Sequence, residues 1–388
     1  MSTAPKNGNG AVGAGIGDPG RLRIAGMGWV TPLGSGVDEV WQRLLNGECA
    51  VPTAISSPLG PDYLVFRVPP EATKQAPAHP RLRRSSAISR FAVVAGVAAL
   101  ADAKLTLDPD VAARTALIFA VSNGGVIYTK RFFNDIVESG AQAASPLLFP
   151  ETVFNAPASH LAAILGITGA SYTLVGDGAV GTLALKMAED LMGNDALDYC
   201  LVVAAEEADW LLCDAYRKWR FLRPAPPIEP FHQPPRGMIL SEGAGALLLG
   251  RRGSVAIERI ASGTNFRNQR EAAWCVEKVV GELCVEPPDL VAASANGTFI
   301  DQAERAAVSK HCPDAKVYAI KQALGESVGA SSLWQTIGAA QSLQHQRIPE
   351  ISPEPQRIPE APLRSAIVST CGVNQQVAGL RLVFSRSP

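Results

Sequence analysis

Apolar positions along the chain alternate between a short-run pattern typical of strands and a spaced pattern typical of helices. The run RLRIAGMGWV (21–30) predicts a strand, and GVDEVWQRLLNG (36–47) has helical spacing with glycine at its end. The run SRFAVVAGVAALADA (89–103) is apolar on most sides and predicts a buried helix. The pattern continues with predicted strands at 115–122, 171–178 and 196–207 and predicted helices at 151–166 and 181–193. This alternating order implies a parallel sheet with helices packed on its faces.

The second part of the chain repeats the theme. The glycine-punctuated run GMILSEGAGALLLGRR (237–252) predicts a hairpin or a pair of edge strands. Two halves of similar build indicate a duplicated α/β core. The remaining predicted strands lie at 254–265, 289–297, 316–321, 365–372 and 378–386, and the remaining helices at 270–283, 301–311 and 332–344.

Three segments show neither the strand-like nor the helix-like spacing of apolar residues. Residues 1–20 are rich in Gly, Ala, Asn and Pro and contain nothing large to bury, so we expect a flexible N-terminal tail. The proline-rich stretch 222–236 precedes the glycine-punctuated run 237–252. A second proline-rich stretch, 347–363, is expected to be a surface connection, because proline cannot join a central strand ladder.

The composition of the chain argues against several classes of function. The 388 residues are 47% apolar and 18% charged, with a net charge of −1, which argues against nucleic acid or an anionic membrane as a partner. No apolar run reaches the roughly 18 residues that a membrane span needs. The seven cysteines show no CxxC pair and no zinc-ligand spacing, so we expect no metal site, no cofactor and a reducing, cytoplasmic location.

One predicted turn, between a strand and a helix, lies at the kind of position where many α/β enzymes carry their catalytic nucleophile. The stretch VGDGAVGT (175–182) follows a predicted strand and opens a predicted helix. Its tip is Gly178, with Asp177 beside it, so the position has no reactive side chain.

From about Arg21 to Phe384 the chain resembles the β-ketoacyl-acyl carrier protein synthases of the thiolase superfamily. The run RIAGMGWVTPLG is similar to their first strand and turn, PFHQPPRGMILSEGAGALLL to their PFD…RDGFVLGEGAG stretch, SANGTFIDQAE to NAHGTSTPxxDxxE, and KQALGESVGASS to KSxxGHxxGAAG. The resemblance implies an α/β, thiolase-like fold of duplicated mixed β-sheets in a layered αβαβα arrangement. It divides the chain into an N-terminal half, 21–250, and a C-terminal half, 251–388. Members are usually dimers through the strand and helix that flank the nucleophile.

The same resemblance implies which catalytic groups are missing. Gly178 stands where the family has cysteine, and Asn296 and Glu326 stand where it has two histidines. Only the family lysine is retained, as Lys321. Condensation requires a thiolate that carries the acyl group and imidazole donors that stabilise the developing enolate. With no family catalytic residue except the lysine in place, we expect no condensing activity from this chain alone.

Two interpretations of the replacement residues remain open. Asp177, Glu326 and Lys321 would converge in the family geometry and either form a structural ion pair or serve as a new acid and base. The stretch STCGVNQQ matches the family loop SFGFGGTN, whose backbone helps to form the oxyanion hole. Cys371, Gly372 and Val373 are therefore expected beside the former site, with Cys371 in a packing role.

The family includes chain-length-factor subunits, which lack the cysteine and pair with an active ketosynthase. By that resemblance we expect a catalytically degenerate subunit that shapes the acyl tunnel of a cysteine-bearing partner in type II polyketide, aryl-polyene or fatty-acid-like biosynthesis. Such subunits usually carry glutamine, not glycine, at the cysteine position. The residues expected in the tunnel wall or interface are Asn123, Phe132, Phe133, Leu147, Leu148 and Phe149.

Two alternatives belong to other classes. One is a stand-alone enzyme that reuses the pocket for acyl transfer or acid-base chemistry on carrier-bound acyl groups, and the other is a non-catalytic homodimer that binds acyl chains. An acyl carrier protein is an expected partner, and Arg81, Arg83 and Arg84 are either its docking residues or a solvated basic turn.

Overall fold

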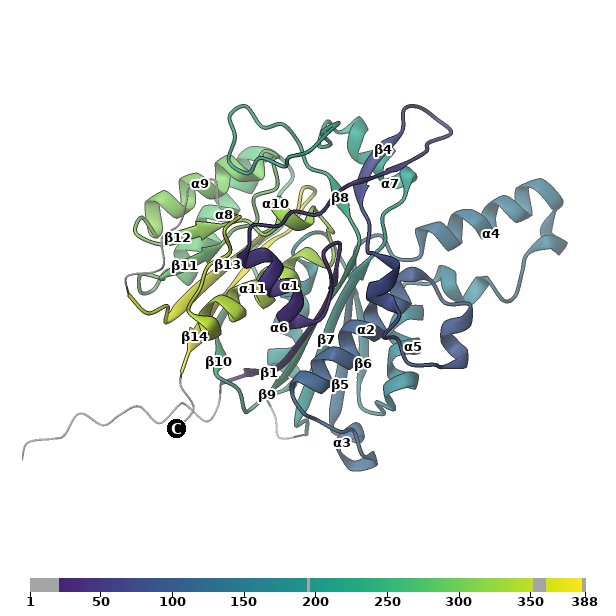
Figure 1. The fold of residues 1–388 in the computed structure, drawn as a ribbon, viewed down its shortest axis with the longest axis horizontal. Helices are drawn as coiled ribbons and strands as arrows, with labels where there is room; N and C mark the ends of the chain where they lie inside the picture. The colour runs from purple at the N-terminus through teal and green to yellow at the C-terminus, as the bar shows by residue number, and fades with distance from the viewer. Residues whose placement is uncertain (1–20, 194–195, 352–360, 386–388) are drawn as a thin grey trace, which may run out of the picture.

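The structure, a computed structural model, describes residues 21–193, 196–351 and 361–385, in which helices cover a large mixed sheet (Figure 1). The strands are β1 (Arg23–Thr31), β2 (Gly34–Ser35), β3 (Thr53–Ile55), β4 (Tyr63–Phe66), β5 (Thr115–Val121), β6 (Ser171–Val175), β7 (Tyr199–Glu206), β8 (Leu240–Ser241), β9 (Gly243–Gly250), β10 (Val255–Ala261), β11 (Leu290–Ala292), β12 (Lys316–Tyr318), β13 (Ser365–Cys371) and β14 (Val377–Phe384). The α-helices are α1 (Val37–Leu45), α2 (Ala87–Asp102), α3 (Pro109–Ala113), α4 (Val126–Ser139), α5 (Ala156–Leu165), α6 (Val180–Leu191), α7 (Trp210–Lys218), α8 (Gln269–Leu283), α9 (Ile300–His311), α10 (Lys321–Leu324) and α11 (Ser331–His345). The 3-10 helices are η1 (Pro70–Thr73), η2 (Pro80–Arg83), η3 (Ala141–Ala143) and η4 (Phe149–Thr152).

The main sheet repeats one plan twice. Its spatial order is β12-β11-β13-β14-β10-β1-β9-β7-β5-β6. The two halves of this order have the same arrangement. Taken in chain order, the first set is β1, β5, β6, β7 and β9, and its members correspond one by one to β10, β11, β12, β13 and β14 of the second set. The two sets meet where β1 pairs with β10, with Arg23 opposite Ala256 and Ile24 opposite Val255. This repeat supports a duplicated core, while the division after residue 250 stays a prediction.

The strand directions correct one sequence prediction. Within each set three strands run parallel, as in β6-β5-β7 and β12-β11-β13. The other two are antiparallel to their neighbours, so the sheet is mixed, as the family resemblance implied, and not parallel throughout.

The predicted hairpin at 237–252 is wrong. Strand β9 lies in the middle of the sheet between β1 and β7, and β8 belongs to a separate small sheet with β3 and β4. The glycines of this run allow close packing of helix α11 on β9, since an ideal Cβ at Gly245 would lie 2.8 Å from the Leu333 Cβ. They do not form a hairpin turn.

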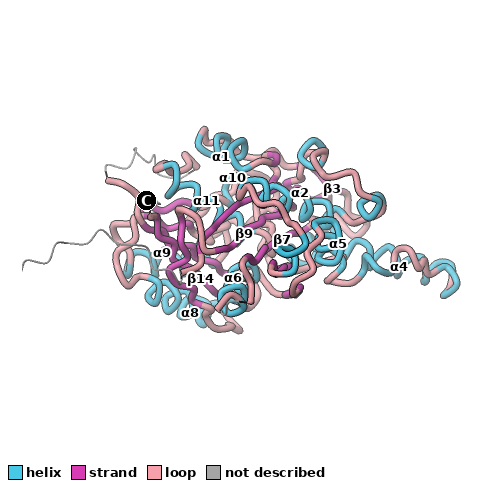
Figure 2. The backbone as a smooth tube through the Cα atoms, turned by 90° about the horizontal axis from the view of Figure 1, so that it is seen from below, coloured by secondary structure: helices cyan, strands magenta, loops and turns pink. Residues whose placement is uncertain are grey.

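The helices form three layers around the sheet. Helices α6 and α11 contact strands of both sets and make the inner layer. Helices α2 and α5 cover the outer face of the first set, and α8 with α9 covers the outer face of the second, as Figures 1 and 2 show. The αβαβα arrangement is therefore confirmed.

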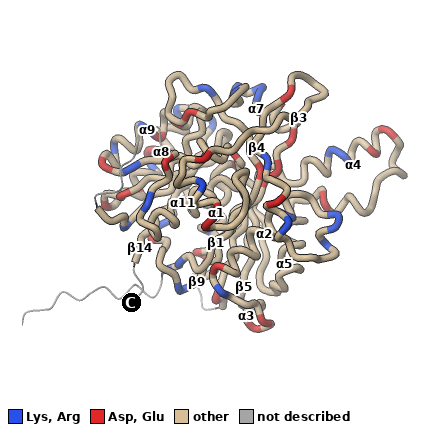
Figure 3. Tube along the Cα trace, viewed as in Figure 1, with Lys and Arg blue, Asp and Glu red and all other residues tan. Residues whose placement is uncertain are grey.

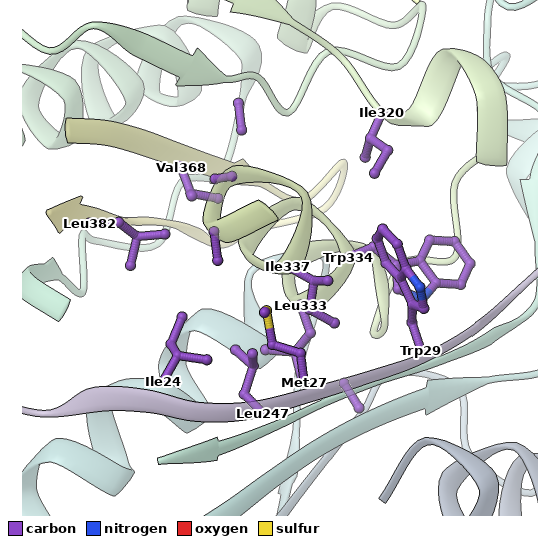
Figure 4. Close-up of a cluster of buried hydrophobic side chains, with 14 of the residues drawn as sticks. Ile24, Met27, Trp29, Leu247, Ile320, Leu333, Trp334, Ile337, Val368 and Leu382 are labelled. Atoms are coloured by element: carbon purple, nitrogen blue, oxygen red, sulfur yellow. The ribbon is translucent and has the colours of Figure 1, made fainter. Parts of the chain in front are cut away.

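The core lies around α11, which is buried along nearly its whole length. Leu333, Trp334 and Ile337 point from this helix toward Trp29 and Met27 of β1 (Figure 4). The Trp334 indole N–H donates to a backbone carbonyl of β9 at 2.8 Å, which satisfies its polar atom inside the core.

Several predicted boundaries shift. The helix predicted at 151–166 begins later, at Ala156, because η4 and the proline at the second position of α5 fix its start. In the proline-rich connection 347–363, Ile348, Ile351 and Leu363 are buried against the main core, which corrects the expected surface position for these three. The rest of that connection, 352–360, and the predicted tail, 1–20, lie outside the described residues.

Surface charge is mixed, with basic and acidic side chains interspersed along the trace in Figure 3. Across the described ranges, none of the helices is both long and apolar enough to cross a bilayer.

Candidate functional site

The turn between β6 and α6 lies against the loop that follows β13. Gly178 is buried at its tip. An ideal Cβ at this glycine would lie 3.0 Å from the Gly372 Cα and 3.4 Å from the Cys371 carbonyl oxygen. The space that a side chain would enter is therefore already bordered by backbone.

Asp177 binds this loop. Its Oδ2 accepts hydrogen bonds from the backbone N–H groups of Asn374 and Gln375, both at 2.9 Å. Its own N–H donates to the Gln376 Oε1 at 2.8 Å. A Cβ at Gly372 would lie 1.9 Å from the Asp177 Oδ2, so only glycine fits there. Asp177 consequently acts as a clamp between two turns that are far apart in sequence.

Lys321, Glu326 and Asn296 form a closed buried network. Lys321 begins α10, Glu326 follows that helix, and Asn296 follows β11. The Glu326 Oε2 accepts from the Lys321 ammonium and from the Asn296 Nδ2, both at 2.7 Å. Its Oε1 accepts from the Val328 N–H at 2.9 Å. The lysine also donates to the Ser294 carbonyl at 3.0 Å, so both charges are paired and hydrogen-bonded.

This network favours the structural interpretation of the replaced residues. Lys321 and Glu326 are 1% and 4% exposed, and their ion pair is one of the two pairs, with Glu326 or with Asp177, that the structural interpretation allowed. Asp177 is engaged by the loop amides and is not part of the pair. The Asn296 amide and the Lys321 ammonium both donate to the Glu326 Oε2, and the ammonium balances the charge of that carboxylate.

Four backbone N–H groups at the end of β13 and in the loop that follows it are bound within the protein. The Cys371 N–H donates to the Ser294 Oγ at 2.9 Å, and the Gly372 N–H donates to the Gln376 carbonyl at 2.8 Å. The amides of Asn374 and Gln375 are bound to Asp177. Val373 is buried in the same hydrophobic cluster as Cys371. These four amides therefore cannot also stabilise an oxyanion.

Cys371 is close to the former nucleophile position but is not a reactive thiol. It is 2% exposed, and burial raises its pKa well above the usual thiol value, with the charges of Asp177 and Glu304 acting in the same direction. A thiol held protonated and away from solvent is a packing residue. The expected packing role is consistent with this environment.

A small cavity lies next to Glu326. Only about 10 Å³ of it is open to the centre of a water-sized sphere, which is room for about one water molecule. This volume is too small for an acyl chain. Its lining is Asn123, Glu206, Glu207, Ala208, Leu212, Tyr216, Leu240, Ser241, Glu326, Ser327 and Val328.

Two carboxyl groups of this cavity were not found from the sequence. Burial raises the pKa of Glu206 to about 8 and that of Glu207 to about 7. Glu206 accepts hydrogen bonds from the backbone of Ser122 and Asn123, so it fixes the loop that leads to α4. The sequence did contain a signal for these two glutamates, since they end a predicted apolar strand, and the carboxyl ends of such strands commonly line a site.

The expected tunnel residues separate into two groups. Asn123 lines the cavity. The others lie on α4 or in the segment after it, where the rings of Phe132 and Phe149 are 5.8 Å apart. Phe133, Leu147 and Phe149 are 62%, 64% and 57% exposed, and Leu148 is half-buried, so none of this group lines the cavity.

Eight exposed apolar side chains lie between residues 133 and 175 of the sequence, and we call this set the α4 surface. Helix α4 projects from the body of the molecule (Figure 1), and no residue in it is buried. Strand β6 lies nearby in sequence and forms an open edge of the main sheet. The members of the α4 surface are Phe133, Val137, Leu147, Phe149, Val153, Phe154, Tyr172 and Val175.

The part of the chain that the structure describes contains no group of three or more His, Cys, Asp or Glu side chains arranged to hold a metal ion.

Comparison with known proteins gives concordant results. Residues 21–254 match the family model for the N-terminal domain of β-ketoacyl synthases. Nodulation protein E of Rhizobium leguminosarum bv. trifolii is 25% identical over 367 residues, covering 87% of this chain and 90% of that protein. The 3-oxoacyl-[acyl-carrier-protein] synthase 2 of Vibrio harveyi is 22% identical over 327 residues, covering 79% of this chain and 77% of that protein.

Solved structures show the same fold. The ishigamide ketosynthase/chain length factor superposes with a TM-score of 0.83 at 21% identity, covering 94% of this chain and 99% of that one. A ketosynthase in complex with its chain length factor from Xenorhabdus doucetiae has a TM-score of 0.75 at 18% identity, covering 94% and 98%. The chain thus has the thiolase-like ketosynthase fold.

Proposed function

This chain belongs to the β-ketoacyl synthase family, and from that premise we propose that it is a non-condensing subunit of the chain-length-factor type. It pairs with a cysteine-bearing ketosynthase and contributes to the wall of the acyl tunnel. The partner carries the acyl thioester and forms the carbon-carbon bond. The product belongs to type II polyketide, aryl-polyene or fatty-acid-like biosynthesis.

The observation that carries the proposal is the state of the former catalytic centre. Gly178 has no thiol, and the Asn296 amide and the Lys321 ammonium are bound to Glu326. Enolate stabilisation requires donors aimed at the developing charge, and a carboxylate in that place repels it. The stand-alone enzyme is therefore the weaker hypothesis, since its proposed acid and base neutralise each other.

The α4 surface supports a large protein interface. Exposed apolar side chains and an open sheet edge favour association, and a partner that covers them removes both from water. Obligate partners bury such regions and leave an apolar interface core. A second copy of this chain would cover the same region, so the choice between partner and homodimer rests on experiment.

We place the acyl tunnel along the interface with the partner. The cavity beside Glu326, with room for about one water molecule, is too small to hold an acyl chain, which supports this placement. In this proposal Phe132, Phe133, Leu147, Leu148 and Phe149 contribute to its wall, and Asn123, which lines the cavity beside Glu326, lies at its inner end.

An acyl carrier protein is the proposed donor of substrate to the pair. Arg81, Arg83 and Arg84 are exposed beside α2, where their positive charge would steer an acidic carrier protein.

The experiment is co-expression with a cysteine-bearing ketosynthase of the same genome. We expect a stable heterodimer that elongates malonyl carrier protein, whereas the partner alone shows reduced yield or altered chain length. The variant Phe133→Asp should abolish pairing, and the matched control Val51→Asp, at a residue 84% exposed outside the α4 surface, should leave pairing intact. A stable homodimer that refuses the partner, or full partner activity without this chain, would contradict the proposal.

A further inference from the structure

The segment that carries most of the α4 surface packs mainly on itself. This segment, residues 125–155, contains α4, η3 and η4 together with six of the eight side chains of the α4 surface, and we call it the arm. The arm projects from the sheet and its covering helices in both views (Figures 1 and 2). Helix α4 packs chiefly against η3 and η4, so the arm needs other contacts to hold its orientation on the body.

One carboxylate attaches the arm to the body. Within residues 125–155, all of which the structure describes, Glu151 of η4 is the single buried residue. Its Oε1 lies 2.5 Å from the Nε2 of His160 in α5, and its Oε2 accepts the N–H of Ser86, the N-cap of α2, at 3.0 Å. An ionised carboxylate only accepts hydrogen bonds, so the imidazole donates its Nε2–H. Glu151 therefore connects the arm to both helices that cover the outer face of the first strand set.

The carboxyl group of Glu151 is held in its charged form. Burial acts to raise its pKa, but the hydrogen bonds from His160 and Ser86 together outweigh burial, and the pKa lies below the ordinary value. Hydrogen bonds to a charged group are stronger than those between neutral groups. A buried carboxylate without donors is costly, so Glu151 separates from His160 and Ser86 only when the arm moves and exposes the carboxylate to water.

The contacts of α4 with the body are also polar. Lys130 donates to both carboxylate oxygens of Asp209, each at 2.9 Å, and its ammonium lies 5.0 Å from the centre of the Trp210 ring. The Tyr128 hydroxyl donates to the Ser85 carbonyl at 3.3 Å. Because the side chains of Lys130 and Asp209 are 25% and 13% exposed, water screens this pair more than it screens Glu151. These contacts hold α4, and Glu151 holds η4.

We propose that Glu151 and His160 form a latch, which holds the arm against α2 and α5 in one orientation and whose opening frees the arm as a unit. Glu151 is buried, so it acts on the position of the α4 surface and is not itself a contact residue. With the latch closed, the α4 surface meets a partner already ordered, and pairing does not have to order it. This consequence for pairing rests on the proposed function, whereas the latch concerns this chain alone.

The test is hydrogen–deuterium exchange of the full chain, read by mass spectrometry, in the variant Glu151→Leu. Leucine keeps an apolar side chain in the buried position but accepts no hydrogen bond. We expect amide exchange about tenfold or more faster in peptides from 126–152, because hydrogen bonds to a charged group are lost. A free 14-residue helix is marginal in water, so α4 loses protection once the arm is released, and exchange in the central sheet should not change.

Two further variants and a control define the latch. His160→Leu removes its other half and should give the same local pattern. Glu151→Gln should restore much of the protection, since its carbonyl accepts from Ser86 and its amide donates to the other imidazole tautomer. Glu138→Leu makes the Leu substitution at an exposed glutamate of α4 and should leave exchange unchanged. The latch is overturned if Glu151→Leu exchanges like the unaltered chain, if exchange rises throughout the molecule, or if neither Leu variant of the latch folds.

Binding to a cysteine-bearing ketosynthase separates the latch from the proposed function. Where the unaltered chain pairs, Glu151→Leu should pair about tenfold or more weakly, because only the fraction of molecules with the arm in place is competent. Equal affinity of the two chains would overturn the role of the latch in pairing. If the unaltered chain does not pair but the exchange pattern is the expected one, the proposed function fails and the latch stands.

Discussion

Removal of the Lys321 charge is the most informative perturbation of the buried network. In Lys321→Met, the Glu326 carboxylate keeps its hydrogen bonds from Asn296 and Val328 but loses the ammonium that pairs with it at 2.7 Å. Because both side chains are almost fully buried, we expect a loss of about 3–5 kcal/mol in the free energy of unfolding. The double variant Lys321→Met/Glu326→Gln removes both charges and should recover most of that loss, leaving a cost of about 1–2 kcal/mol.

The assay is urea unfolding followed by circular dichroism, with comparison of midpoints at equal slope. The control is Lys186→Met, which breaks ion pairs with Glu189 and Asp190 on the exposed face of α6 and should cost less than about 1 kcal/mol. The reasoning is refuted if Lys321→Met costs no more than this control. It is also refuted if the double variant costs the sum of the two single variants.

Three further predictions concern the same region. Gly178→Cys should give a folded protein that forms no condensation product from malonyl carrier protein in a product assay, because donors for the enolate are absent. Chain extension by this variant would show that the loss of the cysteine alone accounts for the missing activity. Gly372→Ala should destabilise the chain far more than Gly60→Ala in thermal unfolding. A Cβ at Gly372 would lie 1.9 Å from the Asp177 Oδ2, whereas the nearest atom to a Cβ at Gly60 would be the Arg217 Nη2 at 3.9 Å. Equal effects would contradict the clamp. The pKa of Glu206 is raised from 4.5 to about 8, so between these pH values the folded chain keeps a proton that the unfolded chain releases. The free energy of unfolding should therefore fall as the pH rises through this window. Urea titrations at several pH values should show that Glu206→Gln reduces this slope by about one proton, and an unchanged slope would exclude Glu206 as its source.

The sequence located the former catalytic positions because each lies inside a local motif. Lys321 was expected to pair with Glu326 or with Asp177, and the structure shows the pair with Glu326. The partners of Asp177 were not predicted, since they come from a loop about two hundred residues later that only the fold brings near. Local pattern predicts which residue stands at a turn, and tertiary contact decides what that residue binds.

The fold shows the same division between local and distant information. Most strands and helices were predicted from periodicity, and the layered arrangement followed from the family resemblance. Strand β9 was missed because its glycines were interpreted as turn residues, whereas they make room for α11 and for the neighbouring strand. A Cβ at Gly243 would lie 2.2 Å from the Val30 carbonyl oxygen. Which purpose a glycine serves is set by residues distant in sequence.

Which subunit carries the acyl group is best measured by intact-protein mass spectrometry of the mixed pair after exposure to an acyl carrier thioester. Our account predicts an acyl mass on the cysteine-bearing partner and an unchanged mass for this chain, alone or in the pair. An acyl thioester on this chain, or chain extension by it in the absence of a partner, would contradict the account.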